Sequence, residues 1–269
     1  MKILTRTPIP SLRRSKSDRL LVVVLALAYA LGSAAEETKQ EEEKPVPGPL
    51  AKLVPKEATE GTVPADGTVV KGAWIVAGSP ARIQMKPLPL CEGWFAFGPE
   101  IREKAATVRA RGKAPGGPRI HSRIGVGLYG KNGFQLRLVP ARAEVELVRR
   151  GAIVLKKALP LDSASTYEME LSVAAEGSAW IVTGRVWEEG GERPATELFR
   201  YKAWDDELLF PLAGTAALVA TPFSGEPVSF QGAEVYLGEV PEEAEVPVEG
   251  APKAEVPKAE SKPAEAKPE

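Results

Sequence analysis

The sequence has little of what most enzymes and metal sites need. Its 269 residues include one histidine, His121, one cysteine, Cys91, and one asparagine, and residues 73–237 contain only three aspartates. A lone cysteine cannot form an intramolecular disulfide, and we expect it to be a buried, inert thiol. Histidine–cysteine clusters and groups of hard oxygen ligands are the usual metal sites, and neither pattern is present. We therefore expect no metal and no cofactor.

A strong charge of either sign is also missing. The formal net charge at pH 7 is −1, because 35 lysines and arginines stand against 36 aspartates and glutamates. Domains that bind nucleic acid usually carry a clustered excess of basic residues. The sequence therefore predicts no nucleic-acid partner.

The N-terminus has the three parts of a secretory signal peptide. Residues 1–19 are basic, residues 20–31 are apolar, and residues 32–35 are small. This pattern predicts a signal peptide over residues 1–35, cleaved after Ala34 or Ala35. The apolar run is shorter than the ~20 residues that cross a bilayer as a helix, so we expect no membrane span after cleavage. The alternative is an uncleaved N-terminal anchor. In either case we expect an exported protein that is periplasmic, extracellular or at the cell surface.

Two segments with few large apolar residues flank the centre of the chain. Residues 36–66 are rich in glutamate and proline, and residues 240–269 repeat proline, alanine, lysine and glutamate. Such segments bury too little apolar surface to offset the entropy of ordering, so we expect a disordered linker and a disordered tail. Residues 67–239 remain as one β-sandwich domain, a length that suits a single core.

Within this domain, apolar and polar residues alternate with a period of two. About a dozen short strands are separated by turn signals, such as Asn132-Gly133 and Arg150-Gly151. This pattern is typical of an all-β fold with two antiparallel sheets packed face to face. Because the Cys-Trp-Cys core of immunoglobulin domains is missing, we predict a jelly roll.

Several segments resemble the modules of one β-sandwich family. They are residues 98–100, residues 123–128, the Gly-Arg-Val-Trp strand with its acidic glycine turn at residues 180–194, and the closing strand at residues 225–235. Together they are similar to concanavalin A-like (laminin G-like and glucanase-like) modules of bacterial exported proteins, to which the 3-keto-disaccharide hydrolase domain is related. The resemblance implies a jelly roll with carbohydrate binding or glycoside processing. Gln231-Gly232 stands where family members often have Asp-Asn.

The catalytic strand of the glucanases in that superfamily, Glu-x-Asp-x-(x)-Glu, is absent. The nearest pairs are Glu144 with Glu146 and Glu168 with Glu170, each of which lies on one face of a strand. Each pair alternates with apolar residues, so we expect a solvated outer face rather than a catalytic pair.

A basic surface is the best candidate for a ligand site. Arg109 and Arg111 alternate along one predicted strand, and His121 and Arg123 alternate along the next. If these strands are neighbours, the four side chains share a face that attracts an acidic glycan, and Trp187 is a candidate for stacking on a sugar ring. The alternative is an exposed face of mixed charge with no ligand.

These observations favour an exported, non-catalytic β-sandwich module that binds a glycan or another polymer of the cell envelope. Two other functions stay open. One is a glycoside-processing hydrolase of the 3-keto-glycoside type, and the other is a structural accessory domain of an envelope assembly.

Overall fold

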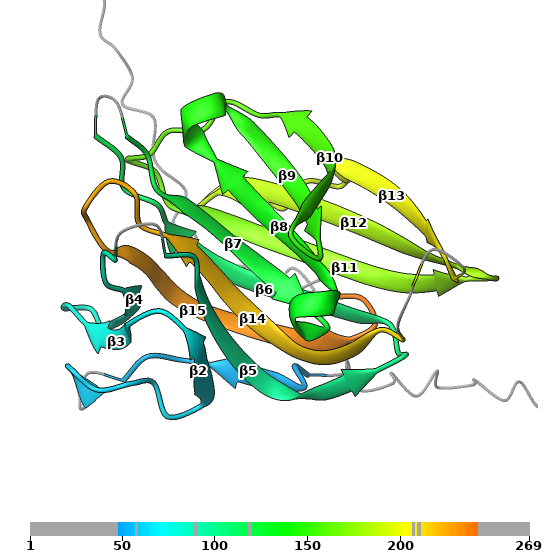
Figure 1. Ribbon diagram of the computed structural model, residues 1–269, viewed down its shortest axis with the longest axis horizontal. Coiled ribbons are helices and arrows are strands. Elements are labelled where there is room, and N and C mark those ends of the chain that lie inside the picture. The colour runs from blue at the N-terminus through cyan, green and yellow to red at the C-terminus, as the bar shows by residue number, and fades with distance from the viewer. Residues whose placement is uncertain are drawn as a thin grey trace, which may run out of the picture. The chain divides into compact units, whose positions relative to one another are not determined.

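Two antiparallel β-sheets, packed face to face, make up the part of the chain that the computed structural model describes (Figure 1). That part comprises residues 48–56, 59–88, 91–117, 120–205, 208 and 211–241. The predicted all-β, antiparallel jelly-roll sandwich is confirmed. None of the helical turns in these residues is long or apolar enough to span a bilayer. The predicted signal peptide, residues 36–47 and 57–58 of the predicted linker, and the predicted tail beyond residue 241 lie outside the described residues.

The larger sheet has eight strands. In spatial order they are β13 (Phe199–Trp204), β12 (Ala179–Glu188), β11 (Tyr167–Glu176), β6 (Ala106–Lys113), β15 (Val228–Leu237), β4 (Arg82–Met85) and β3 (Trp74–Ala77), and β1 (Ala51–Leu53) also pairs with β15. The last described strand, β15, thus lies in the interior of this sheet, between β6 and β4.

The smaller sheet has seven strands. They are, in order, β10 (Ala152–Ala158), β9 (Glu144–Arg149), β8 (Phe134–Val139), β7 (Arg123–Leu128), β14 (Ala213–Thr221), β5 (Gly93–Arg102) and β2 (Gly67–Lys71). Two 3-10 turns, η3 (Gly130–Asn132) and η4 (Pro140–Arg142), join β7 to β8 and β8 to β9.

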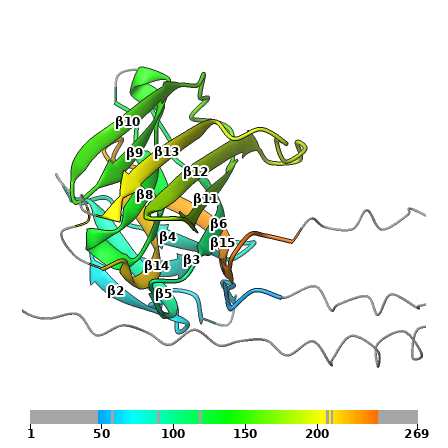
Figure 2. The ribbon, with the colours of Figure 1, turned by 90° about the vertical axis from the view of Figure 1, so that its right-hand side faces the viewer.

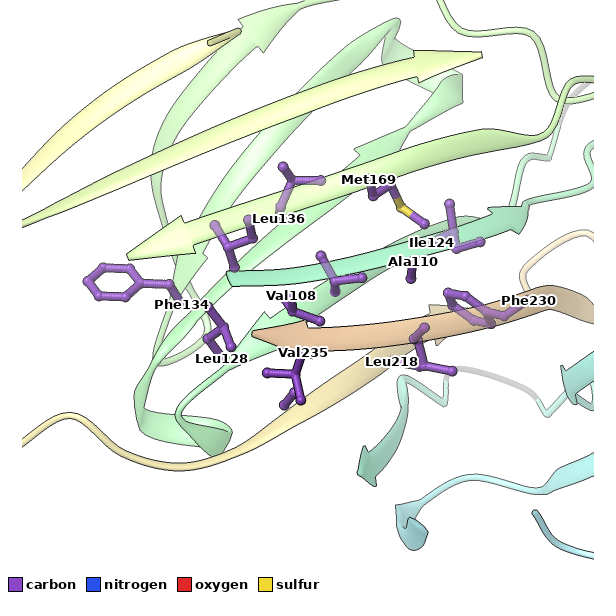
Figure 3. Close-up of a cluster of buried hydrophobic side chains, with 14 of the residues drawn as sticks. Val108, Ala110, Ile124, Leu128, Phe134, Leu136, Met169, Leu218, Phe230 and Val235 are labelled. Atoms are coloured by element: carbon purple, nitrogen blue, oxygen red, sulfur yellow. The ribbon is translucent and has the colours of Figure 1, made fainter. Parts of the chain in front are cut away.

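The core lies between the sheets and comes from alternate residues of their strands. Val108 and Ala110 of β6 face Leu136 of β8 and Leu218 of β14 across the sandwich, as Figure 3 shows. Removing each large apolar side chain from water contributes about 1.5–3 kcal/mol. Because side chains alternate along a strand, the residues between these core positions lie on the outer faces of the sandwich.

The predicted hairpin around Asn132-Gly133 is confirmed, since β7 pairs with β8. Its backbone differs from the expectation. The positive φ angles belong to Tyr129 at 61° and Gly130 at 64°, whereas Gly133 has a φ of −83°. The connection is therefore a 3-10 turn rather than a two-residue turn at Asn-Gly.

The sandwich begins before residue 67, inside the segment expected to be linker. β1 pairs with β15, placing Lys52 opposite Glu234, and the backbone N–H of Leu50 donates a hydrogen bond to the Val235 carbonyl at 2.7 Å. Leu53 is 1% exposed and belongs to the core. Figure 2 shows the described chain entering and leaving on one side of the domain. The short strand is held by these long-range contacts, which composition alone does not reveal.

Candidate functional site

The outer face of the eight-stranded sheet carries a regular array of charged side chains. On β6, Arg109 and Arg111 alternate with the core residues, and on β11 Glu168 and Glu170 do the same. Strand pairing sets Glu168 opposite Arg111 and Glu170 opposite Arg109. Opposite charges that face each other across two strands stabilise the pairing.

Three of the four glutamates that we expected to be solvated are buried, and the fourth, Glu144, is partly buried. Glu146 is 0%, Glu168 4% and Glu170 1% exposed. Each accepts hydrogen bonds from two arginines, whose long side chains cover the carboxylates on the outside of the sheets. The pairs are Glu168 with Arg111 at 2.5 Å and Arg109 at 3.3 Å, Glu170 with Arg193 at 2.7 Å and Arg185 at 2.9 Å, and Glu146 with Arg137 at 2.6 Å and with Arg142. These contacts offset the cost of removing the carboxylates from water.

Two carboxylates are held in the ionised form. Burial by itself raises the pKa of Glu146, but the hydrogen bond from Arg137 and the nearby charges of Arg137, Arg142 and Arg123 outweigh it, so the pKa is lowered. The pKa of Glu234 is lowered for the same kind of reason. Burial raises it, but the hydrogen bonds from Lys52 and Tyr236, together with the charges of Lys52 and Arg109, bring it below the ordinary value. Both groups therefore act as hydrogen-bond acceptors at neutral pH.

A pocket of about 330 Å³ opens on this outer face, between β1 and the middle of the sheet. We call it the β1 pocket. It is lined by Lys52, Leu53, Val54, Arg109, Ala110, Arg111, Glu168, Gln231, Gly232, Ala233 and Glu234. Its volume lies in the range of small-molecule sites.

A β-bulge shapes the mouth of the β1 pocket. The pairing of β15 with β6 shifts between Phe230 and Gly232, so Gln231 is an extra residue on β15. Gln231 Nε2 donates to Glu189 at 3.1 Å, and Arg111 Nη1 lies 3.3 Å from Glu189 and 3.5 Å from Gln231 Oε1. Bulges often re-aim side chains beside functional sites. Here the bulge adds an amide to the charged groups of the pocket.

A second hollow on the same face, of about 740 Å³, follows β11 and β12 away from the β1 pocket. We call it the β11 groove. Its floor includes Ser172 and Thr183, which pair in register, and its walls are formed by residues 238–241 and by Arg193, Ala195 and Glu197. Arg185 and Arg200 also line it.

Of the five residues proposed from sequence, Arg109, Arg111 and Trp187 lie on this face. The guanidinium of Arg109 lies over the Trp187 ring at 5.1 Å from its centroid. Trp187 is only 8% exposed, so it supports Arg109 instead of offering a free ring for stacking.

His121 and Arg123 lie elsewhere, and the expected adjacency of their strand to β6 is wrong. β7 belongs to the seven-stranded sheet, so Arg123 points from the opposite outer face, where it lies over the Phe223 ring at 5.2 Å from its centroid. His121 precedes that strand and forms an isolated bridge with Gly116. Consecutive strands of a sandwich often belong to different sheets, and their outward residues then diverge.

Sequence reasoning missed Lys52, Gln231 and Glu234 as components of the pocket. Lys52 lies in the segment predicted as linker, and Glu234 lies in a plain alternating strand. Gln231-Gly232 was noted only as a departure from the family pattern, although a glycine within a strand is a recognised signal of a bulge.

No group of three or more histidine, cysteine, aspartate or glutamate side chains in the described part of the chain is placed to hold a metal ion. Cys91 is partly buried and packs against the core.

Comparison by sequence finds no matching protein-family model and no matching curated protein. Solved structures do match. They include the carbohydrate-binding module CBM66 from Bacillus subtilis, with 14% identity over 64% of this chain and 95% of that one, at a TM-score of 0.43. Lectin II from Ulex europaeus has 7% identity over 70% of this chain and 96% of that one, at a TM-score of 0.47.

The basic winged bean lectin, solved with Tn-antigen, has 7% identity over 69% of this chain and 96% of that one, at a TM-score of 0.49. By name these neighbours are a carbohydrate-binding module and two lectins. All three identities are under 25% and all three TM-scores are under 0.5, so the likenesses carry no argument about this chain.

Proposed function

We propose that this protein is a carbohydrate-binding module and that the β1 pocket receives a sugar unit of its glycan. The single observation that carries the proposal is the set of hydrogen-bonding groups in that pocket. A sugar presents neighbouring hydroxyls that both donate and accept, and planar groups with two adjacent polar atoms match such pairs. The β1 pocket holds three such groups, the guanidinium of Arg111, the amide of Gln231 and the carboxylate of Glu234.

The groups of the pocket are fixed before any ligand arrives. Glu168 holds Arg109 and Arg111, Lys52 Nζ contacts Glu234 at 2.6 Å, and the Tyr236 hydroxyl donates to Glu234 at 2.6 Å. Preorganised side chains lose little conformational entropy when they bind, which favours affinity.

The charge pattern supports a glycan without a dense negative charge. Lys52, Arg109 and Arg111 are all paired with carboxylates, and Glu234 stays ionised at the pocket wall. An acidic polymer would meet this carboxylate as well as the arginines. From the sequence, the arginines were expected to attract an acidic glycan. Because they are paired with carboxylates, the pocket instead favours a ligand that presents hydroxyl groups.

Binding is better supported than glycoside hydrolysis. A hydrolase needs a carboxyl group that can donate a proton to the leaving oxygen. Glu146, Glu168 and Glu170 each accept hydrogen bonds from two arginines, which occupy the carboxylate oxygens that would have to reach a substrate. The signal-like pattern of residues 1–35 further leads us to propose that the module acts outside the cytoplasm, on a glycan of the cell envelope or its surroundings.

The test is a glycan array probed with the full chain, followed by calorimetric titration of the saccharides that bind. We expect Arg111→Ala and Gln231→Ala to reduce affinity for the same saccharides about tenfold each, as expected for the loss of one well-placed polar contact. Arg102→Ala is the matched control, because Arg102 is an exposed arginine paired with an exposed glutamate on the other sheet. Affinity should change little between low and high salt, since hydrogen bonds, not exposed charges, carry it.

Two results would contradict the proposal. One is an array on which the parent chain binds no saccharide. The other is binding that Arg111→Ala and Gln231→Ala leave as strong as in Arg102→Ala while all three variants melt like the parent.

A further inference from the structure

The β11 groove lies beside the β1 pocket on one face of one sheet. In strand register, Glu170 stands between Arg109, which lines the pocket, and Arg185, which lines the groove. These three positions span two inter-strand spacings, about 10 Å in all. Along β11, Glu168 of the pocket and Ser172 of the groove are four residues apart, about 13 Å. The two hollows are therefore adjacent, but one sugar ring cannot fill both.

The floor of the groove is made of side chains suited to hydroxyl groups. Thr107, Ser172 and Thr183 come from three neighbouring strands at one register level. The Thr107 hydroxyl is already used, since it donates to the carbonyl of Gly238 at 2.6 Å. Ser172 and Thr183 line the open volume between the two walls. The Ser172 hydroxyl lies 2.9 Å from that of Thr107, which leaves Thr183 as the hydroxyl that a polyhydroxylated chain would contact most readily.

One buried donor on the groove has no acceptor. Arg185 Nε is buried and has no hydrogen-bond partner among the described residues, although Arg185 Nη1 contacts Glu170 at 2.9 Å. A buried N–H without an acceptor is costly, so such a group often marks the place of a ligand or ordered water. The arginines of the groove are paired with carboxylates: Arg185 and Arg193 contact Glu170, and Arg200 lies 3.4 Å from Glu176. This balance suits a neutral oxygen-rich ligand.

We propose that the β11 groove binds further units of the glycan whose first unit occupies the β1 pocket, so that the ligand is a chain of several sugars lying across β11. This inference rests on the proposed function. It names the ligand class, an oligosaccharide or an internal stretch of a polysaccharide, instead of a single terminal sugar.

The experiment titrates oligosaccharides into the full chain by calorimetry. The ligands are the disaccharide, tetrasaccharide and hexasaccharide of three neutral polymers, β-1,4-glucan, β-1,4-xylan and β-1,4-mannan. For a series that binds, we expect the hexasaccharide to bind at least about tenfold more tightly than the disaccharide, because contacts in the groove become intramolecular once the pocket is occupied. Thr183→Val removes one hydroxyl from the groove at constant volume, and Arg200→Ala removes part of its wall. Either change should bring hexasaccharide affinity towards that of the disaccharide for the parent chain.

Thr68→Val on β2 is the matched control, because Thr68 is an exposed strand threonine of the other sheet, and it should keep the full length dependence. If the parent binds disaccharide and hexasaccharide equally, the inference is overturned while the proposed function stands. If Thr183→Val and Arg200→Ala both keep the length dependence of the parent, the groove is not the second subsite. If the parent binds no member of the three series and nothing on the array, both proposals fail together.

Discussion

Each outer face of the sandwich carries a buried glutamate held by two arginines, an arrangement that we call a clamp. On the seven-stranded sheet Glu146 is clamped by Arg137 and Arg142, and on the eight-stranded sheet Glu168 is clamped by Arg109 and Arg111. The arginines of the two clamps are alike in their contact with water. Each clamp has one mostly covered arginine, Arg137 at 13% and Arg109 at 21% exposed, and one arginine at 43%, Arg142 and Arg111.

The two clamps differ in the space around them. On the seven-stranded sheet the Trp94 ring covers small residues, and a Cβ placed on Gly127 would lie 3.2 Å from it, with Ala217 and Val219 in the same cluster. On the eight-stranded sheet, β1 and the bulge at Gln231 leave a pocket beside the clamp. Paired arginine and glutamate side chains therefore stabilise both outer faces. The space beside the pair decides whether a ligand can bind to that face.

Removing the most buried carboxylate should have the largest effect. Among the described residues, Glu146→Ala leaves Arg137 paired with Glu92 alone, at 3.3 Å. We expect the substitution to lower the free energy of unfolding by about 3–5 kcal/mol. Glu168→Ala should cost less, because the Glu168 side chain is 6% exposed whereas that of Glu146 is fully buried. Urea unfolding followed by tryptophan fluorescence measures both, with Glu100→Ala in an exposed pair as the control. Equal losses for Glu146→Ala and Glu100→Ala would show that burial of the clamp is unimportant.

Removing the wall of the β1 pocket should have the next largest effect. Leu53→Ala deletes a core side chain of β1 and should cost about 2–5 kcal/mol, the range for leucine in a packed core. Leu50→Ala is the matched control, because Leu50 is 40% exposed, and it should change stability by less than ~0.5 kcal/mol. Thermal melts of the two variants decide whether β1 belongs to the folded domain. Indistinguishable melts would return residues 51–53 to the linker that composition predicts.

The pH dependence that Glu146 gives to stability should be a smaller effect. The pKa of Glu146 is lower in the folded protein than in the unfolded chain, so its contribution is present above the unfolded value of about 4.5 and is lost as the pH falls through the folded pKa. One such group changes stability by at most about 1.4 kcal/mol per pH unit. Urea unfolding between pH 7 and pH 3 should show a shallower acid loss for Glu146→Gln than for the parent. Identical slopes would mean that Glu146 does not contribute.

Much of the fold was predictable from local pattern. Alternation on β6 and β11 predicted which residues enter the core, and the turn at Arg150-Gly151 predicted the pairing of β9 with β10, because both signals depend only on neighbouring residues. The outward positions of Arg109, Arg111, Glu168 and Glu170 followed from the same period of two. Period two identifies a face, but it does not identify the sheet to which a strand belongs.

By itself, then, the sequence determined the class of fold and, for strands such as β6 and β11, the core residues and the outward side. Only the tertiary structure decided that β6 and β7 lie in different sheets, that Arg109 meets Glu168 across 59 residues of chain, and that β1 closes a pocket against β15. The physical reason is that an outward-facing charge is buried only when a neighbouring strand supplies its partner. Which strands are neighbours depends on how the whole sandwich packs, and the clamp and the pocket both form at that stage.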